Sequence, residues 1–184
     1  MSFRYDIRLS GEGGQGLVLA GRILAEAAAI YDNKNATQSQ SYGPEARGGA
    51  SRSEVIISDE DIDYPKATRL DLLLALTQES CNKYSRDLKE NGILLVDSMA
   101  VTRVPEGSYR IFQAPISDIA RTRLGRVVVA NIVALGIIAQ LSQIVSVDAL
   151  ESAVLARVPK GTEELNLKAF HTGIEVAQEL LATR

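Results

Sequence analysis

The sequence contains few of the residues that redox and metal chemistry require. Its 184 residues include one cysteine, Cys81, one histidine, His171, and no tryptophan. A single thiol cannot form an internal disulfide, and it cannot supply the thiolates of an iron–sulfur cluster. We therefore expect Cys81 to be a buried core residue and His171 to be structural or exposed. One lone thiol fits a reducing compartment, so the predicted location is the cytoplasm.

Long apolar runs and an excess of basic residues are also missing. The longest apolar run, residues 127–141, is interrupted by Asn131 and Gln140. It is shorter than the run of about 18 residues that spans a bilayer. The formal net charge is −3, whereas nucleic-acid binders are normally basic. We expect no membrane partner and no nucleic-acid partner. The chain starts directly with a predicted strand, so we also expect no signal peptide.

What the sequence does contain is a glycine-rich turn, Ser10–Gly16, between a predicted strand (5–9) and a predicted helix (17–30). Glycine tolerates a positive φ and lets a ligand approach the backbone closely. The start of a helix offers free N–H groups and a partial positive charge. The turn therefore predicts a phosphate-binding loop. Its candidate ligand-binding residues are Gly11, Gly13, Gly14, Gln15 and Gly16.

Two other interpretations of this turn stay open. The glycines match the dinucleotide-binding pattern G-x-G-x-x-G, which also needs an acidic residue at the end of the second strand. The predicted second strand, 36–40, is followed by Ser41, and Asp32 precedes it. A stand-alone dinucleotide-binding oxidoreductase is therefore disfavoured. The other alternative is a tight turn that binds nothing, as in a purely structural protein.

Predicted strands and helices alternate along the chain. After the glycine-rich turn, the strands are predicted at 36–40, 54–58, 70–76, 93–97 and 109–113. Helices are predicted at 78–88, 117–124 and 127–141, and two more follow Ser146. This alternation predicts an α/β fold. We expect a single domain over residues 1–184, with a Rossmann-like, largely parallel sheet flanked by helices and a helical C-terminal third. The pair Asn91-Gly92 is the predicted stop of the helix at 78–88.

The segment from Ser41 to Gly49 is rich in glycine and proline and follows a predicted strand. Functional loops of α/β proteins often lie there. Arg47 and Arg52 offer guanidinium groups suited to a phosphate or a carboxylate. A solvated loop is the alternative interpretation. Five other arginines could meet a polyphosphate or an acidic partner if several face one way: Arg103, Arg110, Arg121, Arg123 and Arg126.

No catalytic residue and no metal ligand are predicted. The acidic run 59–63 lacks the glycine and the distal glutamate of a calcium loop, which favours a solvated turn. The sequence has no Ser–His–Asp order and no glycine–lysine phosphate loop. Asn131 lies in a stretch that is apolar all round and is therefore expected to be enclosed. We expect its amide to bond to a neighbouring loop rather than to a ligand.

Three motifs together resemble those of a known family. Gly11–Gly16 is similar to the opening of the gamma subunit of 2-oxoacid:ferredoxin oxidoreductases, Gln38–Gly49 to its second signature, and Asn131–Gly136 to its late helix. All three occur in the family's order, and the resemblance covers nearly the whole chain. It favours the 2-oxoglutarate type, with the pyruvate and 2-oxoisovalerate types as alternatives.

The resemblance implies that this chain works only as part of a larger enzyme. Coenzyme A is the implied co-substrate. Thiamine diphosphate, magnesium and iron–sulfur clusters would lie on alpha and beta subunits, with a delta subunit as a further candidate, and ferredoxin would be reached through the complex. The chain lacks the G-D-G and Asn pattern that holds thiamine diphosphate. The loop 42–49 is a candidate assembly surface. The implied coenzyme A-binding residues are the five of the glycine-rich turn together with Ser41, Tyr42 and Arg47.

Overall fold

The computed structural model describes residues 2–44 and 49–184, which build a six-stranded sheet in the order β2-β3-β1-β4-β5-β6. The strands are β1 (Arg4–Glu12), β2 (Asn35–Tyr42), β3 (Ala50–Ser58), β4 (Leu70–Ala75), β5 (Leu88–Asp97) and β6 (Arg110–Ala114). Strands β1, β4, β5 and β6 run parallel, whereas β3 is antiparallel to both β1 and β2. The predicted α/β fold with a largely parallel sheet is confirmed. Strand β3 runs antiparallel because the loop after β2 is too short for the crossover that a parallel pair needs.

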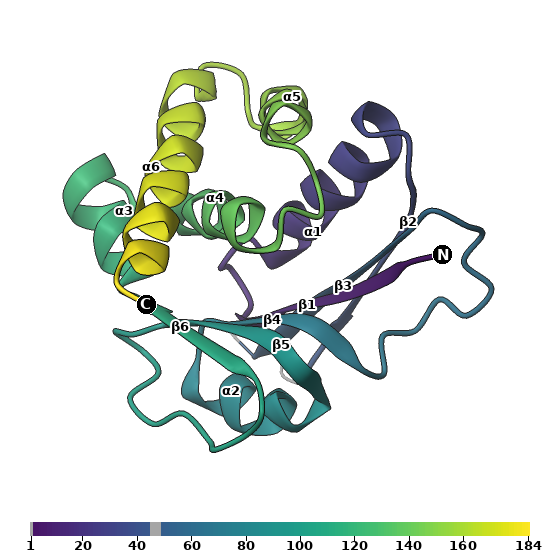
Figure 1. Cartoon of the computed structure of the whole chain (residues 1–184). Coiled ribbons are helices and arrows are strands. Elements are labelled where there is room, and N and C mark those ends of the chain that lie inside the picture. Colours follow the sequence, from purple (N-terminus) through teal and green to yellow (C-terminus); the bar gives the residue numbers. More distant parts are fainter. Residues whose placement is uncertain (1, 45–48) are drawn as a thin grey trace.

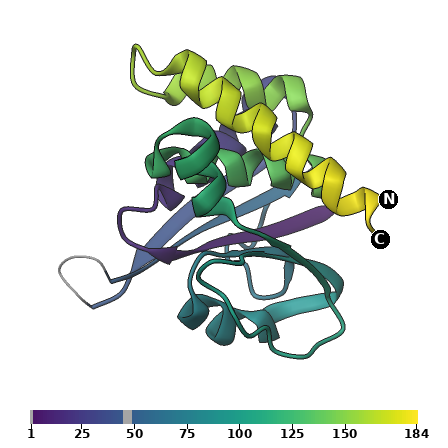
Figure 2. The ribbon, with the colours of Figure 1, turned by 90° about the vertical axis from the view of Figure 1, so that its left-hand side faces the viewer.

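Helices cover the two faces of the sheet unequally. One face carries α1 (Leu17–Glu26), α3 (Ile116–Leu124), α4 (Ala130–Ser142), α5 (Val147–Arg157) and α6 (Glu163–Ala182). The opposite face carries the short α2 (Gln78–Tyr84) and the long connection from β5 to β6 (Figures 1 and 2). The helical C-terminal third is therefore confirmed, and it lies on the face that α1 also covers. None of the described helices is both long and apolar enough to cross a membrane.

The two faces bury separate cores. In β4, Leu72 and Leu74 belong to the larger cluster beneath the five helices. Leu73 and Ala75 belong to the smaller cluster beneath α2, together with the buried Cys81. A strand that alternates between two cores reads as a continuous apolar run, which is why this segment was recognisable in the sequence. The prediction that Cys81 fills the core is confirmed.

The helix predicted at 78–88 is too long. Helix α2 ends at Tyr84, a 3₁₀ turn follows over Ser85–Asp87, and β5 already begins at Leu88. Leu88 pairs with Leu70 of β4, so pairing between strands distant in the sequence overrides the local helical pattern. Asn91, with φ +61°, lies inside β5 where the register against β4 shifts. The predicted helix stop is therefore an irregularity within a strand.

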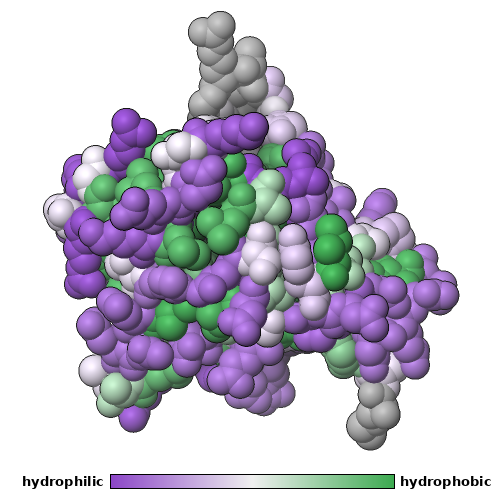
Figure 3. Space-filling model, turned by 90° about the horizontal axis from the view of Figure 1, so that it is seen from above, coloured by the Kyte–Doolittle hydropathy of each residue, from purple (hydrophilic) through white to green (hydrophobic). Residues whose placement is uncertain are grey.

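Residues 131–139 of α4 are enclosed as predicted, but two of the three valines before the helix are exposed. Every residue from Asn131 to Ala139 is buried. Val127 and Val128, in a 3₁₀ turn, are 54% and 66% exposed. Seen from the helical side, the surface shows apolar residues grouped among polar ones (Figure 3). The apolar run in the sequence thus joins a buried helix to an exposed turn.

Helices α4 and α6 cross at a pair of glycines, a feature that the sequence analysis did not identify. A Cβ atom on Gly136 would collide with the carbonyl oxygen of Phe170, and one on Gly173 would collide with that of Val133. The two backbones are so close that neither position leaves room for a side chain. This crossing fixes α6 on α4 and thereby holds the helical layer together.

Candidate functional site

The glycine-rich turn joins β1 to α1 in the geometry predicted for a phosphate loop. Gly14 and Gly16 have φ of +88° and +72°, which favours glycine at both positions. Gly16 is the N-cap of α1, and no side chain caps this helix. The amide groups of the first helical turn have no partner within the helix. They are therefore available to an anion.

The five predicted residues of the turn have different roles. A Cβ on Gly11 would collide with the side chain of Gln15, whereas a Cβ on Gly14 would meet nothing within 4 Å. The Oε1 of Gln15 accepts a 2.6 Å hydrogen bond from the amide of Glu12. The amide of Gly13 bonds to the carbonyl of Gly49 at 2.8 Å. Gly14 is thus the open point of the turn, while Gly11, Gly13 and Gln15 hold its shape.

Asn131 supports the turn from behind. This residue is 4% exposed, and its Nδ2 donates a 3.1 Å hydrogen bond to the carbonyl of Gly16. A Cβ on Gly16 would lie too close to that amide group. The predicted hydrogen bond from Asn131 to a neighbouring loop is confirmed. Asp32, the acidic residue considered for a ribose, instead accepts two 2.7 Å hydrogen bonds from Ser146 at the start of α5.

Strand register brings the two predicted groups of site residues to one edge of the sheet. Tyr42 pairs with Ser51, and Ser51 pairs with Gly11, so these three residues form a row across β2, β3 and β1. Ser41 lies in the next row, opposite Arg52. This edge holds the carboxyl ends of all the strands except β3. Open α/β sheets bind their ligands at such an edge.

Two neighbouring hollows with shared lining residues lie along this edge. The glycine-loop hollow, about 170 Å³, opens between the end of β1 and the start of α2. The Tyr84 hollow, about 370 Å³, lies beside the end of β2 and is lined by Ser41 and Tyr42. Both hollows are lined by Ala50, Ser51, Lys83 and Tyr84. The structure therefore brings Gly11, Ser41 and Tyr42 together around shared walls.

A third hollow lies on the helical side of the turn. It measures about 330 Å³, and its walls include Gly14, Gly16, Leu19 and Val128. Among the described residues that line it, Arg126 alone is charged. The glycine-rich turn thus separates a mainly apolar hollow from the polar hollows near α2.

A cluster of charged residues that no sequence pattern predicted surrounds Tyr84. Arg8 is 4% exposed, and its guanidinium lies 4.7 Å from the centre of the Tyr84 ring. It donates hydrogen bonds to Asp87 at 2.6 Å and to Glu54 at 3.3 Å. Arg52 and Lys83 lie 5.6 Å and 5.4 Å from the same ring. A charged residue at an inward position of an apolar strand, as Arg8 is in β1, was the available signal.

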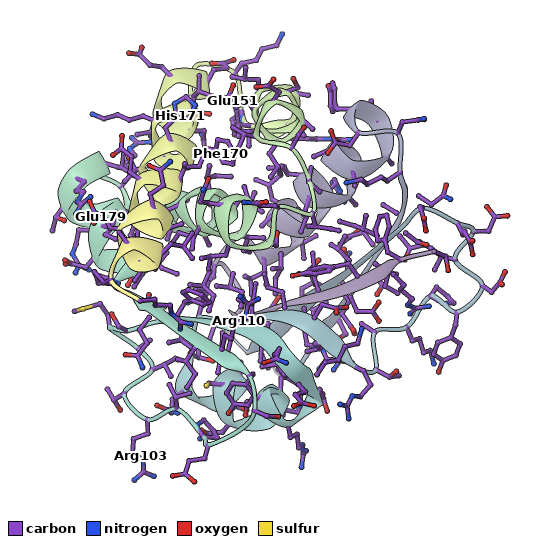
Figure 4. All side chains as sticks on the ribbon, viewed as in Figure 1. Arg103, Arg110, Glu151, Phe170, His171 and Glu179 are labelled. Atoms are coloured by element: carbon purple, nitrogen blue, oxygen red, sulfur yellow. The ribbon has the colours of Figure 1, made fainter. Side chains whose placement is uncertain are left out.

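The remaining predicted residues do not join this site. Arg47 lies outside the described residues. Arg103 projects from the connection on the α2 side and Arg110 lies on β6, whereas Arg121 and Arg123 belong to α3 on the other face (Figure 4). Arg126, by contrast, lines the hollow beside Gly14, so the five later arginines do not gather into one polyphosphate surface. His171 of α6 is half exposed, and its Nε2 lies in hydrogen-bond contact with Glu151 of α5 (Figure 4).

Within residues 2–44 and 49–184, no three His, Cys, Asp or Glu side chains lie close enough together to hold a metal ion. The sheet edge presents backbone groups, hydroxyl groups and the cations Arg52 and Lys83, together with the carboxylates of Glu12 and Glu79. The amides, hydroxyl groups and cations are groups that can bind an anion.

The sequence is similar to curated proteins along almost its full length. It is 53% identical over 182 residues to the 2-oxoglutarate synthase subunit KorC of Methanocaldococcus jannaschii, covering 98% of this chain and 97% of that protein. In structure, it matches the gamma subunit of a keto/oxoacid ferredoxin oxidoreductase from Geobacter sulfurreducens with a TM-score of 0.86 and 59% identity. That match covers 95% of this chain and 99% of the other.

A further likeness shows the fold alone. It is to the 2-oxoglutarate:ferredoxin oxidoreductase of Magnetococcus marinus, with a TM-score of 0.84 and 23% identity. The match covers 96% of this chain and 31% of that one, whose structure contains 2-oxoglutarate, coenzyme A and succinyl-CoA. Residues 6–176 match the pyruvate ferredoxin/flavodoxin oxidoreductase family. The chain therefore belongs to the pyruvate ferredoxin/flavodoxin oxidoreductase family.

Proposed function

We propose that this chain is the gamma subunit of a 2-oxoglutarate:ferredoxin oxidoreductase. The complete enzyme would convert 2-oxoglutarate, coenzyme A and oxidised ferredoxin into succinyl-CoA, carbon dioxide and reduced ferredoxin. The observation that carries the proposal is the end-to-end similarity to a 2-oxoglutarate synthase subunit. The pyruvate and 2-oxoisovalerate types are the competing outcomes of the substrate test below.

The proposal assigns the redox and carbanion chemistry to other subunits. This chain has one cysteine, and that cysteine is buried, so its side chains do not fit an iron–sulfur cluster. Thiamine diphosphate, magnesium and the clusters would lie on alpha and beta subunits, with a delta subunit as a further candidate partner. Ferredoxin would meet the complex and not this chain. Residues 1–184 would act as one gamma-type domain in the cytoplasm.

The chain's own contribution is contact with coenzyme A at the carboxyl edge of the sheet. The uncapped start of α1 and the open backbone at Gly14 suit the diphosphate of a nucleotide. Gly14 and Gly16 line the hollow on the helical side of the turn, whereas Ser41 and Tyr42 line the Tyr84 hollow, so the proposed ligand would have to cross the turn to contact both groups. Tyr42 is also 65% exposed, which supports a second role of this loop in subunit assembly. Loss of co-purifying subunits after Tyr42→Ala would support that role, and their retention would argue against it.

The test is a substitution at Gly14 in the assembled enzyme. Gly14→Val would impose a side chain on a backbone with positive φ at the open point of the turn. We expect KM for coenzyme A to rise about ten-fold, since one charge-assisted contact is worth roughly that factor. KM for the 2-oxoacid should not change.

Gly125→Val is the matched control, because Gly125 also has a positive φ and open space around it. An unchanged KM for coenzyme A in the Gly14 variant would contradict the proposed contact. The same preparation, assayed with 2-oxoglutarate, pyruvate and 2-oxoisovalerate, tests the substrate type. Faster turnover of either alternative acid would contradict the 2-oxoglutarate assignment.

A further inference from the structure

The two edge strands of the sheet, β2 and β6, differ in how they are protected (Figure 1). Strand β6 has five residues and begins with Arg110, and its Ile111 carbonyl accepts a hydrogen bond from the guanidinium of Arg184. Strand β2 has eight residues, none of them charged and none of them proline. Short length, charged side chains and proline commonly protect a sheet edge against pairing with another strand. Strand β2 therefore lacks the protection that β6 has.

The ladder between β2 and β3 shows which backbone groups of β2 point outward. The amide of Gly43 donates a 2.7 Å hydrogen bond to the carbonyl of Ala50, one step beyond the regular pairing of β2 with β3. Bonding alternates along an antiparallel ladder, so the odd-numbered residues of β2 bond to β3 and the even-numbered residues point away from it. Within the described part of the chain, no strand lies on that outer side. The edge thus presents a row of unpaired amides and carbonyls, those of Ala36, Gln38, Gln40 and Tyr42.

Strand β2 is also exposed to solvent. None of its residues is buried, whereas each of the other five strands contains buried residues. Large apolar side chains are exposed at both of its ends. Ile30 and Tyr31 precede β2 in the turn that continues α1, and Tyr42 is the last residue of the strand. Exposed apolar side chains beside an unpaired strand edge indicate a contact surface.

These exposed apolar side chains lie on one face of the sheet. Gln38 pairs with Val55, which belongs to the larger core beneath the five helices. Paired residues point to the same face and side chains alternate along a strand, so Tyr42 points to the helical face as well. Ile30 and Tyr31 follow α1, which covers this face. Each end of the β2 edge therefore carries aromatic surface on the helical side.

We propose that β2 pairs antiparallel with β2 of a second copy of this chain. A two-fold axis perpendicular to the sheet near Ser39 would relate the two strands and keep both helical layers on the same side. It brings Tyr42 of each copy toward the end at which Ile30 and Tyr31 of the other lie, so the contact is self-complementary. Like charges directly opposite each other would destabilise such a pair, and β2 contains none. The two sheets join into one, and this inference does not depend on the proposed function.

The test is the oligomeric state of the purified full chain, measured by sedimentation velocity over a concentration series. We expect a dimer that dissociates on dilution. Gln40→Pro removes an amide that points away from β3, and proline is tolerated in an edge strand where the amide faces solvent. This variant should be monomeric. Gln40→Ala, the matched control, keeps the amide and should dimerise like the unaltered chain.

Ser39→Lys is a second variant, which keeps every backbone amide but places like charges near the two-fold axis. It should weaken dimerisation by about ten-fold or more. Circular dichroism verifies that both variants fold. Hydrogen exchange, followed by NMR, compares the amides of Gln38 and Gln40 with those of Thr37 and Ser39. Dimerisation should slow exchange of the first pair by about ten-fold or more, whereas bonds to β3 protect the second pair in monomer and dimer alike.

A chain that stays monomeric throughout the concentration series would overturn the inference. A dimer that persists in Gln40→Pro, or that leaves the amides of Gln38 and Gln40 unprotected, would also overturn it, because the copies would then meet at another surface. If these amides become protected only when other subunits are added to a monomeric chain, the edge binds a strand of a different protein, and pairing between copies is wrong.

Discussion

At the scale of single residues, burial lowers the reactivity of the Cys81 thiol. Cys81 is fully enclosed in the smaller core beneath α2. Burial raises the pKa of its thiol, because the thiolate would lose its hydration. A raised pKa means a smaller thiolate fraction at any pH near neutrality. The thiolate is the reactive form.

We therefore expect Cys81 to resist alkylation in the folded chain. At pH 8, iodoacetamide should label it at least about ten-fold more slowly than in denaturant, because both access and thiolate fraction are reduced. Mass spectrometry of timed samples measures this ratio. Labelling of the folded chain at the denatured rate would contradict the buried position.

The glycines of the glycine-rich turn are required for two different reasons, a positive φ and a lack of space for a side chain. A side chain at position 14 would meet no neighbouring atom, so the need for glycine there comes from the positive φ alone. Gly11 lacks a side chain because Gln15 occupies that space, and Gly16 because Asn131 does. From the sequence, all of these residues were predicted to contact a ligand. Only the packing around the turn separates Gly14, the open position, from the residues that hold its shape.

Pairs of elements are held by contacts that no local pattern reveals. The crossing of α4 and α6 depends on Gly136 and Gly173, whose positions leave no room for a Cβ. Helices that meet with glycine on both sides pack backbone against backbone. A methyl group at either position would push the helices apart and disturb the core around Phe170.

Gly173→Ala should destabilise the chain despite the better helix propensity of alanine. We expect a loss of about 1–3 kcal/mol in the free energy of unfolding, the usual range for overpacking a core. Urea denaturation followed by circular dichroism measures the change. Glu175→Ala, on the exposed side of the same helix, is the control and should stay within about 0.5 kcal/mol. A Gly173 variant as stable as the control would show that the helices do not touch this closely.

The boundaries and directions of some strands could be determined only from the tertiary structure. Residues 85–88 continue a helical pattern in the sequence, yet Leu88 pairs with Leu70 and begins β5. The direction of β3 was likewise not predicted, because it depends on which neighbour the strand finds after a short loop. That direction matters for function, since it places Ser51 between Gly11 and Tyr42.

At the scale of the whole molecule, the proposal gives this chain a binding role and leaves oxidation to its partner subunits. We expect the purified chain alone to show no 2-oxoglutarate oxidation with ferredoxin or an artificial electron acceptor. It should also lack the visible absorbance of an iron–sulfur cluster, because it contains one cysteine. Addition of the partner subunits should produce activity that depends on coenzyme A. Turnover by the chain alone would contradict the assignment as a subunit.

The sequence by itself determined the α/β class, the glycine-rich turn, the buried Cys81 and the family. The first three features follow from signals that act over a few residues, such as apolar periodicity, the φ preference of glycine and the start of a helix, whereas the family follows from the resemblance of three motifs. The tertiary structure decided the antiparallel direction of β3, the glycine crossing and the charge cluster at Tyr84. That cluster joins Arg8 of β1, Arg52 of β3 and Lys83 of α2, which meet through the register of the two strands and the packing of α2 on the sheet. Register depends on the global packing of strands, so no local pattern could have revealed it.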